Sequence, residues 1–212
     1  MTQHRNMNQR RNNILDFART CGFDEAHAQQ VECLAGTLFL ALEPLHQLNP
    51  DDRRLLEYSA LLHDIGYSIA GKGHHRHGMN LVLMEPLTDF SNEEKLMIAN
   101  LVRYHRKSLP TLEHAAFSAL PDSCKLRIGL LAPLLRIADA LDRSHSQSVQ
   151  EMNFDIGDAT ISLFLGAENE LPTEMAALSR KIDMFRHVYK RDLEIHYVLP
   201  RLQANLVPDL VE

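Results

Sequence analysis

The 212-residue chain lacks tryptophan and contains only three cysteines, Cys21, Cys33 and Cys124. Their odd number, and the absence of a CxxC spacing, argue against a disulfide scaffold and against a thiolate zinc site, and favour a reducing compartment. No apolar run approaches the length that spans a bilayer, and residues 1–13 lack the apolar core of a secretory signal. A cytoplasmic protein without membrane contact is therefore expected.

The chain also lacks an excess of positive charge. Its formal net charge is −6, so no general nucleic-acid-binding surface is expected. Basic residues gather instead in three short segments, at residues 72–76, 103–107 and 136–143. The length fits one domain, or one domain with a small appendage, and is sufficient for a substantial core.

Helical patterns occupy residues 14 to about 143. Asp24 is a suitable N-cap for a helix that runs to about Leu45. The sequence NPDD at residues 49–52 starts the next helix, which is expected to end at Gly66. The sequence SNEE at residues 91–94 has the spacing of a capping box and starts a further helix. Between Pro110 and Pro121 we expect a loop with one helical turn, followed by an apolar helix over residues 122–143.

After Ser144 the pattern changes to alternation. Residues 152–156 and 161–165 alternate around a turn signal at residues 157–158, which predicts a β-hairpin with one buried face. An amphipathic helix is expected over residues 174–189 and a third strand over residues 193–197. The predicted fold is mainly α, with a flexible N-terminus (1–13), a helical domain (14–145), a small β-β-α-β appendage (146–200) and a C-terminal tail (201–212).

Six potential metal ligands share one feature, which is that each falls on the apolar face of a predicted helix. They are His27, His63, Asp64, His77, His105 and Asp139. A single inward histidine is usually a hydrogen-bonded core residue. Five separate segments that aim such costly polar groups at a common interior favour a metal site instead.

An imidazole and carboxylate set without thiolates suits Mn, Fe, Co, Ni, Zn or Mg, and the spacing does not choose among them. One or two ions are expected. In the two-ion arrangement Asp64 bridges, His27, His63 and Asp139 complete the first site, and His77 and His105 hold the second. Two such ions activate water and stabilise the entering and leaving oxygens of a phosphoryl displacement. Asp64 is therefore also a candidate catalytic residue.

Four cations lie beside these ligands and are candidates for binding phosphate oxygens that do not react, namely Arg106, Lys107, Arg136 and Arg143. Lys107 is the strongest of them and is also assigned to the catalytic set. The alternatives are a solvated helix end for Arg106 and Lys107, and ordinary helix ion pairs with Asp139 for Arg136 and Arg143.

Three further residues have two open interpretations. His74 and His75 suit a solvated loop, although either could replace His77 if the helix starts elsewhere. Asp142 suits the surface, although it could also accept a hydrogen bond from a metal ligand.

The segments at residues 61–66 (LLHDIG), 74–78 (HHRHG), 101–110 (LVRYHRKSLP) and 135–142 (LRIADALD) resemble the HD superfamily of metal-dependent phosphohydrolases. More narrowly, residues 24 to about 200 resemble the helical C-terminal half of exopolyphosphatase/guanosine pentaphosphatase proteins. The resemblance implies an HD-type helical domain whose metal ligands are His27, His63, Asp64 and Asp139. Members with two ions add histidines at positions that match His77 and His105.

Exopolyphosphatases of this family carry their phosphatase active site in actin-like N-terminal domains, which a chain of this length cannot include. We therefore expect a free-standing HD-type phosphohydrolase, either a phosphatase or a phosphodiesterase, that acts on a nucleotide or another small phosphorylated substrate. The alternative is a non-catalytic regulatory module that binds a nucleotide, an alarmone or polyphosphate. The complete ligand set favours the enzyme. The substrate, the metal and the oligomeric state, including a homodimer, stay open.

Overall fold

The computed structural model describes the backbone of residues 2–198 and the side chains of residues 8–197. The predicted C-terminal tail, residues 201–212, lies outside this range. The elements in chain order are α1 (Thr2–Thr20), α2 (Glu25–Ala41), α3 (Glu43–His46), α4 (Pro50–Leu62), the 3-10 helix η1 (Ile65–Ser68), α5 (His74–Met84), α6 (Asn92–Tyr104), α7 (Ala115–Ser118), α8 (Asp122–Leu141), β1 (Val149–Ile156), β2 (Thr160–Ala167), α9 (Pro172–Tyr189) and β3 (Asp192–Val198). The predicted fold class, a mainly helical chain with a small sheet at its C-terminal side, is confirmed.

Three of the predicted helix starts have the expected cap chemistry. The Asp24 carboxylate accepts a hydrogen bond from the backbone N–H of His27 at the start of α2. Asn49 with Asp52, and Ser91 with Glu94, form complete capping boxes at α4 and α6. The predicted helix from Asp24 to about Leu45 is divided into α2 and α3, and the helix expected to end at Gly66 ends at Leu62.

The first helix begins earlier than predicted, at Thr2 rather than near Ile14. Ion pairs hold the polar first half of α1 against other helices. Arg10 pairs with Glu94 of α6, and Arg11 pairs with Glu32 of α2. These partners are distant in sequence, so the polar composition of residues 1–13 did not indicate them.

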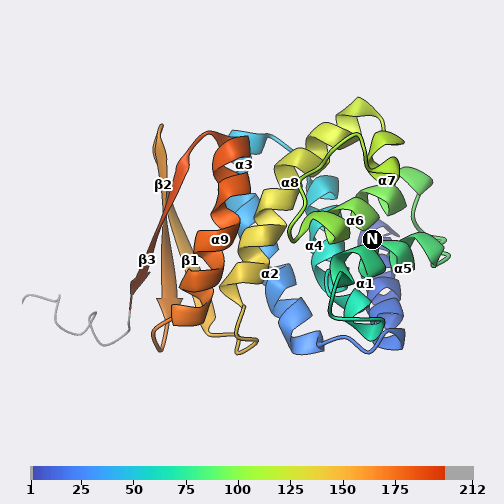
Figure 1. Cartoon of the computed structure of the whole chain (residues 1–212), viewed down its shortest axis with the longest axis horizontal. Coiled ribbons are helices and arrows are strands. Elements are labelled where there is room, and N and C mark those ends of the chain that lie inside the picture. The colour runs from blue at the N-terminus through green and yellow to red at the C-terminus, as the bar shows by residue number, and fades with distance from the viewer. Residues whose placement is uncertain (1, 199–212) are drawn as a thin grey trace, which may run out of the picture.

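Helix α8 is the centre of the helical part (Figure 1). It packs against α2, α4, α6 and α9, and its second half is buried on all sides. A helix that is apolar all round is expected at such a position. Asp139 in its last turns and Asp142, the residue directly after it, are both buried.

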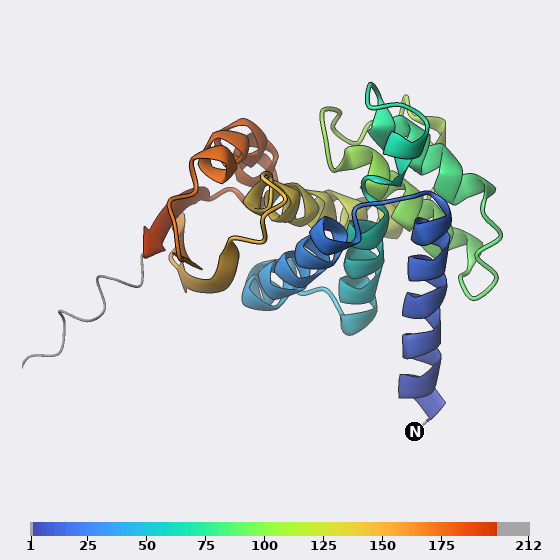
Figure 2. The same ribbon diagram turned by 90° about the horizontal axis from the view of Figure 1, so that it is seen from below.

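The sheet has the order β1-β2-β3. Strands β1 and β2 form the predicted antiparallel hairpin, with Ile156 opposite Ile161, while β2 and β3 are parallel and are connected through α9. Alternate residues of β2 are buried, which confirms the expected single buried face. Figures 1 and 2 show α9 lying between the sheet and α8, so this helix belongs to both parts of the molecule. None of the described helices is long and apolar enough to cross a membrane.

Candidate metal centre and cationic cleft

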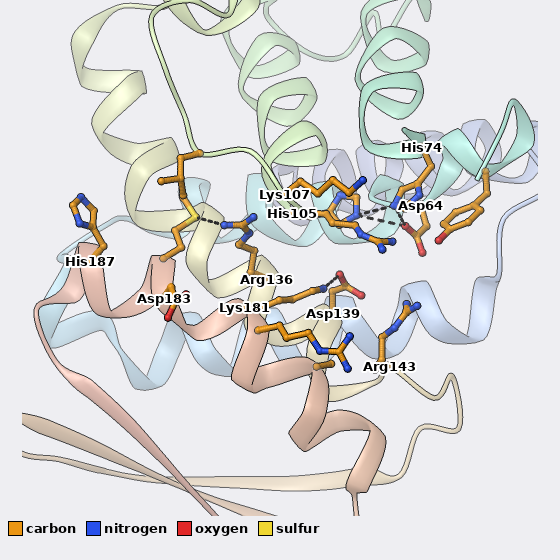
Figure 3. Close-up of a pocket in the computed structure, with 16 residues that line it drawn as sticks. Asp64, His74, His105, Lys107, Arg136, Asp139, Arg143, Lys181, Asp183 and His187 are labelled. Carbon is orange, nitrogen blue, oxygen red and sulfur yellow. Dashed lines mark hydrogen bonds and ion pairs between the residues drawn. The ribbon is translucent and has the colours of Figure 1, made fainter. Parts of the chain in front are cut away.

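Asp64 lies between two sets of imidazole rings. Its Oδ2 atom is 3.4 Å from Nε2 of His63 and 3.9 Å from Nε2 of His27. Its Oδ1 atom is 3.4 Å from Nε2 of His74 and 3.6 Å from Nε2 of His105 (Figure 3). We call His27, His63 and Asp64 the first donor group, and Asp64, His74 and His105 the second. The carboxylate thus joins two possible metal positions.

Backbone hydrogen bonds set the orientation of three of these rings. In His63, His74 and His105, Nδ1 lies 2.6–2.9 Å from the carbonyl oxygen three residues earlier in the chain. A carbonyl oxygen can only accept, so Nδ1 carries the hydrogen and Nε2 of the neutral ring has a free lone pair. In all three rings the atom that faces Asp64 is therefore the one able to bind a metal.

The ring nitrogens also face one another in pairs. The Nε2 atoms of His27 and His63 are 3.2 Å apart, and those of His74 and His105 are 3.3 Å apart. Two lone pairs at this distance repel unless a proton or a metal ion lies between them. All four histidines are almost fully buried, so water does not compensate. The donor set fits one or two divalent ions.

The pKa values describe the same site with protons in place of metal. Burial alone lowers the pKa of His63, but the Asp64 and Asp139 carboxylates outweigh it and raise that pKa to about 9. Burial and the neighbouring His63 lower the pKa of His105 to about 3. Burial acts against ionisation of Asp64, yet His63 and the other rings hold its pKa well below the usual range. A positive charge at His63, beside Asp64 and Asp139, is thus favoured, and a divalent ion would also supply positive charge there.

Asp139 of α8 lies at the edge of the first donor group. Its Oδ1 atom is 4.0 Å from Nε2 of His27, and its Oδ2 atom forms an ion pair with Lys181 of α9. Burial opposes ionisation of Asp139, but Lys181 and His63 lower its pKa. Asp139 is therefore a fourth possible ligand of the first donor group, and Lys181 pairs with its Oδ2 atom.

His77 is the one predicted ligand that the structure places elsewhere. It is half-buried and belongs to neither donor group, whereas His74 occupies the expected position beside His105. The prediction followed a stripe from His77 to Leu81 and Met84, but Met84 is 81% exposed. The buried face of α5 instead contains His74, His75, Gly78 and Val82.

The start of α5 explains this difference. Gly73 has a left-handed φ of 83° and turns the chain so that the helix begins at His74. At Gly66 a Cβ atom would lie 2.0 Å from the carbonyl oxygen of His74, so only glycine allows η1 to approach α5 this closely. His75 is also buried, but it joins neither group.

A cleft of about 650 Å³ opens next to Asp64, His74 and His105. All four predicted phosphate-binding cations, Arg106, Lys107, Arg136 and Arg143, line it. Helix α9 adds a set that the sequence did not reveal, namely Arg180, Lys181, Asp183, Met184 and His187 (Figure 3). No motif distinguishes these residues from the solvated face of an ordinary amphipathic helix. The cleft thus combines a cationic wall with the second donor group and with Asp139.

Arg136 is the most deeply placed of these cations. It is 7% exposed, and its Nη1 atom contacts the Met184 sulfur at 3.3 Å. Its Nε atom has no hydrogen-bond partner among the described residues, and Asp139 pairs with Lys181 rather than with Arg136. Burial lowers the pKa of Arg136. A buried guanidinium without a carboxylate partner, at the wall of a cleft, is suited to binding an anion.

Asp142 is buried, at 1% exposure, and does not lie on the surface. Its Oδ2 atom accepts a hydrogen bond from Nδ1 of His27 at 2.8 Å. The second of the two sequence interpretations of Asp142 is therefore the one that the geometry supports. His27, like the other three histidines, directs its Nε2 atom toward Asp64.

Comparison with known proteins adds independent information. A family model described as Ppx/GppA phosphatase, domain III, matches residues 10–180, which include both donor groups and most of the cleft-lining residues. The chain is also similar to a guanosine-5'-triphosphate,3'-diphosphate pyrophosphatase from Photobacterium profundum, with 32% identity over 136 residues. This alignment covers 64% of the chain and 27% of the relative, so the chain spans about a quarter of that protein's length.

Proposed function

Because the chain belongs to the Ppx/GppA phosphatase family through its domain III, we propose that it is a metal-dependent phosphohydrolase acting on a phosphoester of a nucleotide or another small phosphorylated compound. One observation carries the proposal: the second donor group lines a cleft that also has six cations in its wall, and it shares Asp64 with the first donor group. The name of the relative makes a phosphorylated guanosine nucleotide a suitable first substrate to test.

The two donor groups would bind separate metal ions. His27, His63, Asp64 and Asp139 would hold one ion, and Asp64, His74 and His105 would hold a second. Divalent ions in such a site supply activated water and stabilise the charge that develops on phosphoryl oxygens. The carbonyl bonds at Nδ1 keep His63, His74 and His105 in the form that can donate from Nε2.

The cationic wall would bind the substrate. Arg136 lines the cleft with an Nε–H group that has no partner among the described residues, and Arg106, Lys107 and Arg143 add charge from two other segments. Guanidinium and ammonium groups bind phosphate oxygens that do not react, and so orient the phosphorus toward the donor groups. Lys181 pairs with Oδ2 of Asp139 and leaves Oδ1 facing His27.

Asp64→Asn tests the proposal directly. An amide cannot bridge two cations as a carboxylate does, so we expect metal content to fall and hydrolysis to drop by a factor of at least about 100. The measurements are elemental analysis of the purified protein, and a phosphoester screen with Mn²⁺ or Co²⁺, with and without chelator. The matched control is Asp158→Asn, which makes the same charge change at an exposed residue of the hairpin turn and should leave both readouts unchanged.

A different result would favour the regulatory module. If no metal supports turnover of any phosphoester, while calorimetry shows tight nucleotide or polyphosphate binding that survives Asp64→Asn, the cleft binds without catalysis. If the wild-type protein binds no divalent ion under these conditions, the metal-dependent proposal is wrong.

A further inference from the structure

His27 differs from the other three histidines of the site in how its ring is held. Its Nδ1 atom bonds to the side chain of Asp142, which lies 115 residues later in the chain, and not to a carbonyl of its own helix. We propose that the junction loop, residues 142–148 between α8 and β1, positions His27 for metal binding, with Asp142 fixing both the ring orientation and the tautomer. This inference rests on the metal site of the proposed function.

Both oxygens of Asp142 are used. Oδ1 accepts a hydrogen bond from the backbone N–H of Gln147 at 2.7 Å. Oδ2 accepts from Nδ1 of His27 at 2.8 Å and from the side-chain amide of Gln147 at 3.3 Å. Gln147 has a left-handed φ of 51°, and the loop there folds back on the carboxylate. The carboxylate is thus held from both sides, and Nδ1 of His27 must be a donor because a carboxylate can only accept.

A second residue of the junction loop holds the face of the same ring. His145 stacks on His27, with ring centroids 3.7 Å apart and planes inclined by 6°. Nδ1 of His145 bonds to Oδ2 of Asp24, whose Oδ1 accepts from the backbone N–H of His27. The N-cap of α2, the junction loop and the ring of His27 therefore form one connected unit.

The junction loop is also tied to the appendage. The backbone N–H of Ser144 donates to Glu174 of α9, which is buried at 3% exposure. Gln30, one turn after His27 on α2, donates to the carbonyl of Val149 at the start of β1. Through these hydrogen bonds, the positions of the sheet and α9 affect the position of His27, one ligand of the first donor group.

Asp142→Asn separates tautomer control from packing, because the two side chains have the same shape. The amide has one acceptor and one donor end. Its donor end cannot face the Gln147 backbone N–H, since two donors would then meet and the backbone group cannot change. The donor end must face His27, whose Nδ1 then has to accept, which moves the ring hydrogen to Nε2. That hydrogen occupies the lone pair that the metal needs.

The experiment uses the full chain and two readouts. Long-range ¹H–¹⁵N spectra of the metal-free protein report the tautomer of His27, and calorimetric titration with Mn²⁺ reports affinity. We expect the Nδ1–H form in the wild-type protein, the Nε2–H form in Asp142→Asn, and Mn²⁺ affinity lower by about 10–100-fold in the variant. Asp122→Asn, at the exposed first turn of α8, is the matched control and should match the wild type in both readouts.

The outcomes separate this inference from the proposed function. If Asp142→Asn keeps the Nδ1–H tautomer and the wild-type Mn²⁺ affinity, the positioning role is overturned while the metal site stands. If the wild-type protein binds no Mn²⁺, the proposed function fails, and the spectra still test the tautomer. Should the variant not fold, the wild-type spectrum decides, because an Nε2–H form of His27 there would contradict the role of Asp142.

Discussion

The guanidinium of Arg136 is buried without a carboxylate partner, which costs stability. A bound anion would offset that cost. The neighbouring Met184 sulfur is a weak acceptor and does not replace an anion. Asp139 would be the natural partner within the same helix, but Lys181 occupies it. This placement supports the proposed binding role of Arg136 rather than a role in the core.

Arg136→Met should separate these two roles. Methionine has a similar length and fits the apolar contact with Met184, so the free energy of unfolding should stay the same or rise by about 1 kcal/mol. The KM for a phosphorylated substrate should rise at least about tenfold, with a smaller change in kcat, because the group binds oxygens that do not react. Urea denaturation and steady-state kinetics measure both, with the exposed Arg19→Met as control. A strongly destabilised variant with normal KM would contradict the binding role.

Several candidate residues were predictable from sequence because helical periodicity alone directs them inward. His27, His63 and His105 follow apolar stripes that are indeed buried, and Asp64 and Asp139 lie near them. Lys181 was not predictable, since a lysine on an amphipathic helix is normally solvated and its partner Asp139 lies 42 residues away. Whether these residues bind metal is a prediction that the tests above address.

At the scale of elements, the start of α5 decides which histidine belongs to the second donor group. The repeat of apolar residues after His77 predicted the wrong face of this helix, because exposed Met84 is apolar while the buried face carries His74 and Gly78. Binary patterning is a weak guide on a helix whose inward face is built from ligands and glycine. The cap residue Gly73 is the local signal that fixes the register.

A matched pair of substitutions on α5 tests this register. His74→Ala removes a donor that lies 3.4 Å from Asp64, so it should reduce the stoichiometry under saturating Mn²⁺ from two ions to one. His77→Ala lies three residues away on the same helix and should retain both ions. Elemental analysis after removal of free metal gives the counts. The assignment is wrong if His77→Ala loses an ion and His74→Ala does not.

The helices and the hairpin were more predictable than the way they assemble. Capping chemistry and alternation are local signals, and most of the elements they predicted are present. The packing of α9 on both α8 and the sheet, and the parallel pairing of β3 with β2, depend on contacts between distant segments. For that reason the appendage was predicted in outline, while its share of the cleft was not.

At the scale of the whole molecule, the buried histidines make the stability of the metal-free protein depend on pH. His63, with its pKa raised to about 9, binds more proton in the folded than in the unfolded state, so its stabilising contribution is complete below about pH 6.5 and is lost as pH rises through 9. His105, with its pKa lowered to about 3, acts in the opposite sense and costs stability as pH falls below about 6.5.

Urea denaturation with chelator should therefore show a maximum near pH 6.5. The free energy of unfolding should fall on both sides, by on the order of 2–3 kcal/mol toward pH 9. Added Mn²⁺ should flatten the alkaline side, because the ion replaces the proton between the rings. A metal-free profile that does not change between pH 6.5 and 9 would contradict the assigned pKa of His63.

The ion pair between Lys181 and Asp139 has a consequence for how the chain folds. Asp139 lies in the helical part, but its cationic partner is on α9, which follows the whole β-hairpin in sequence. An ionised carboxylate at this depth is costly until its partner arrives. Helices close in sequence assemble quickly, whereas the parallel pairing across α9 requires slower closure of a long loop. We therefore expect the cleft to form late in folding, with docking of α9 as the step that brings Lys181 to Asp139 and adds the α9 residues to the cleft.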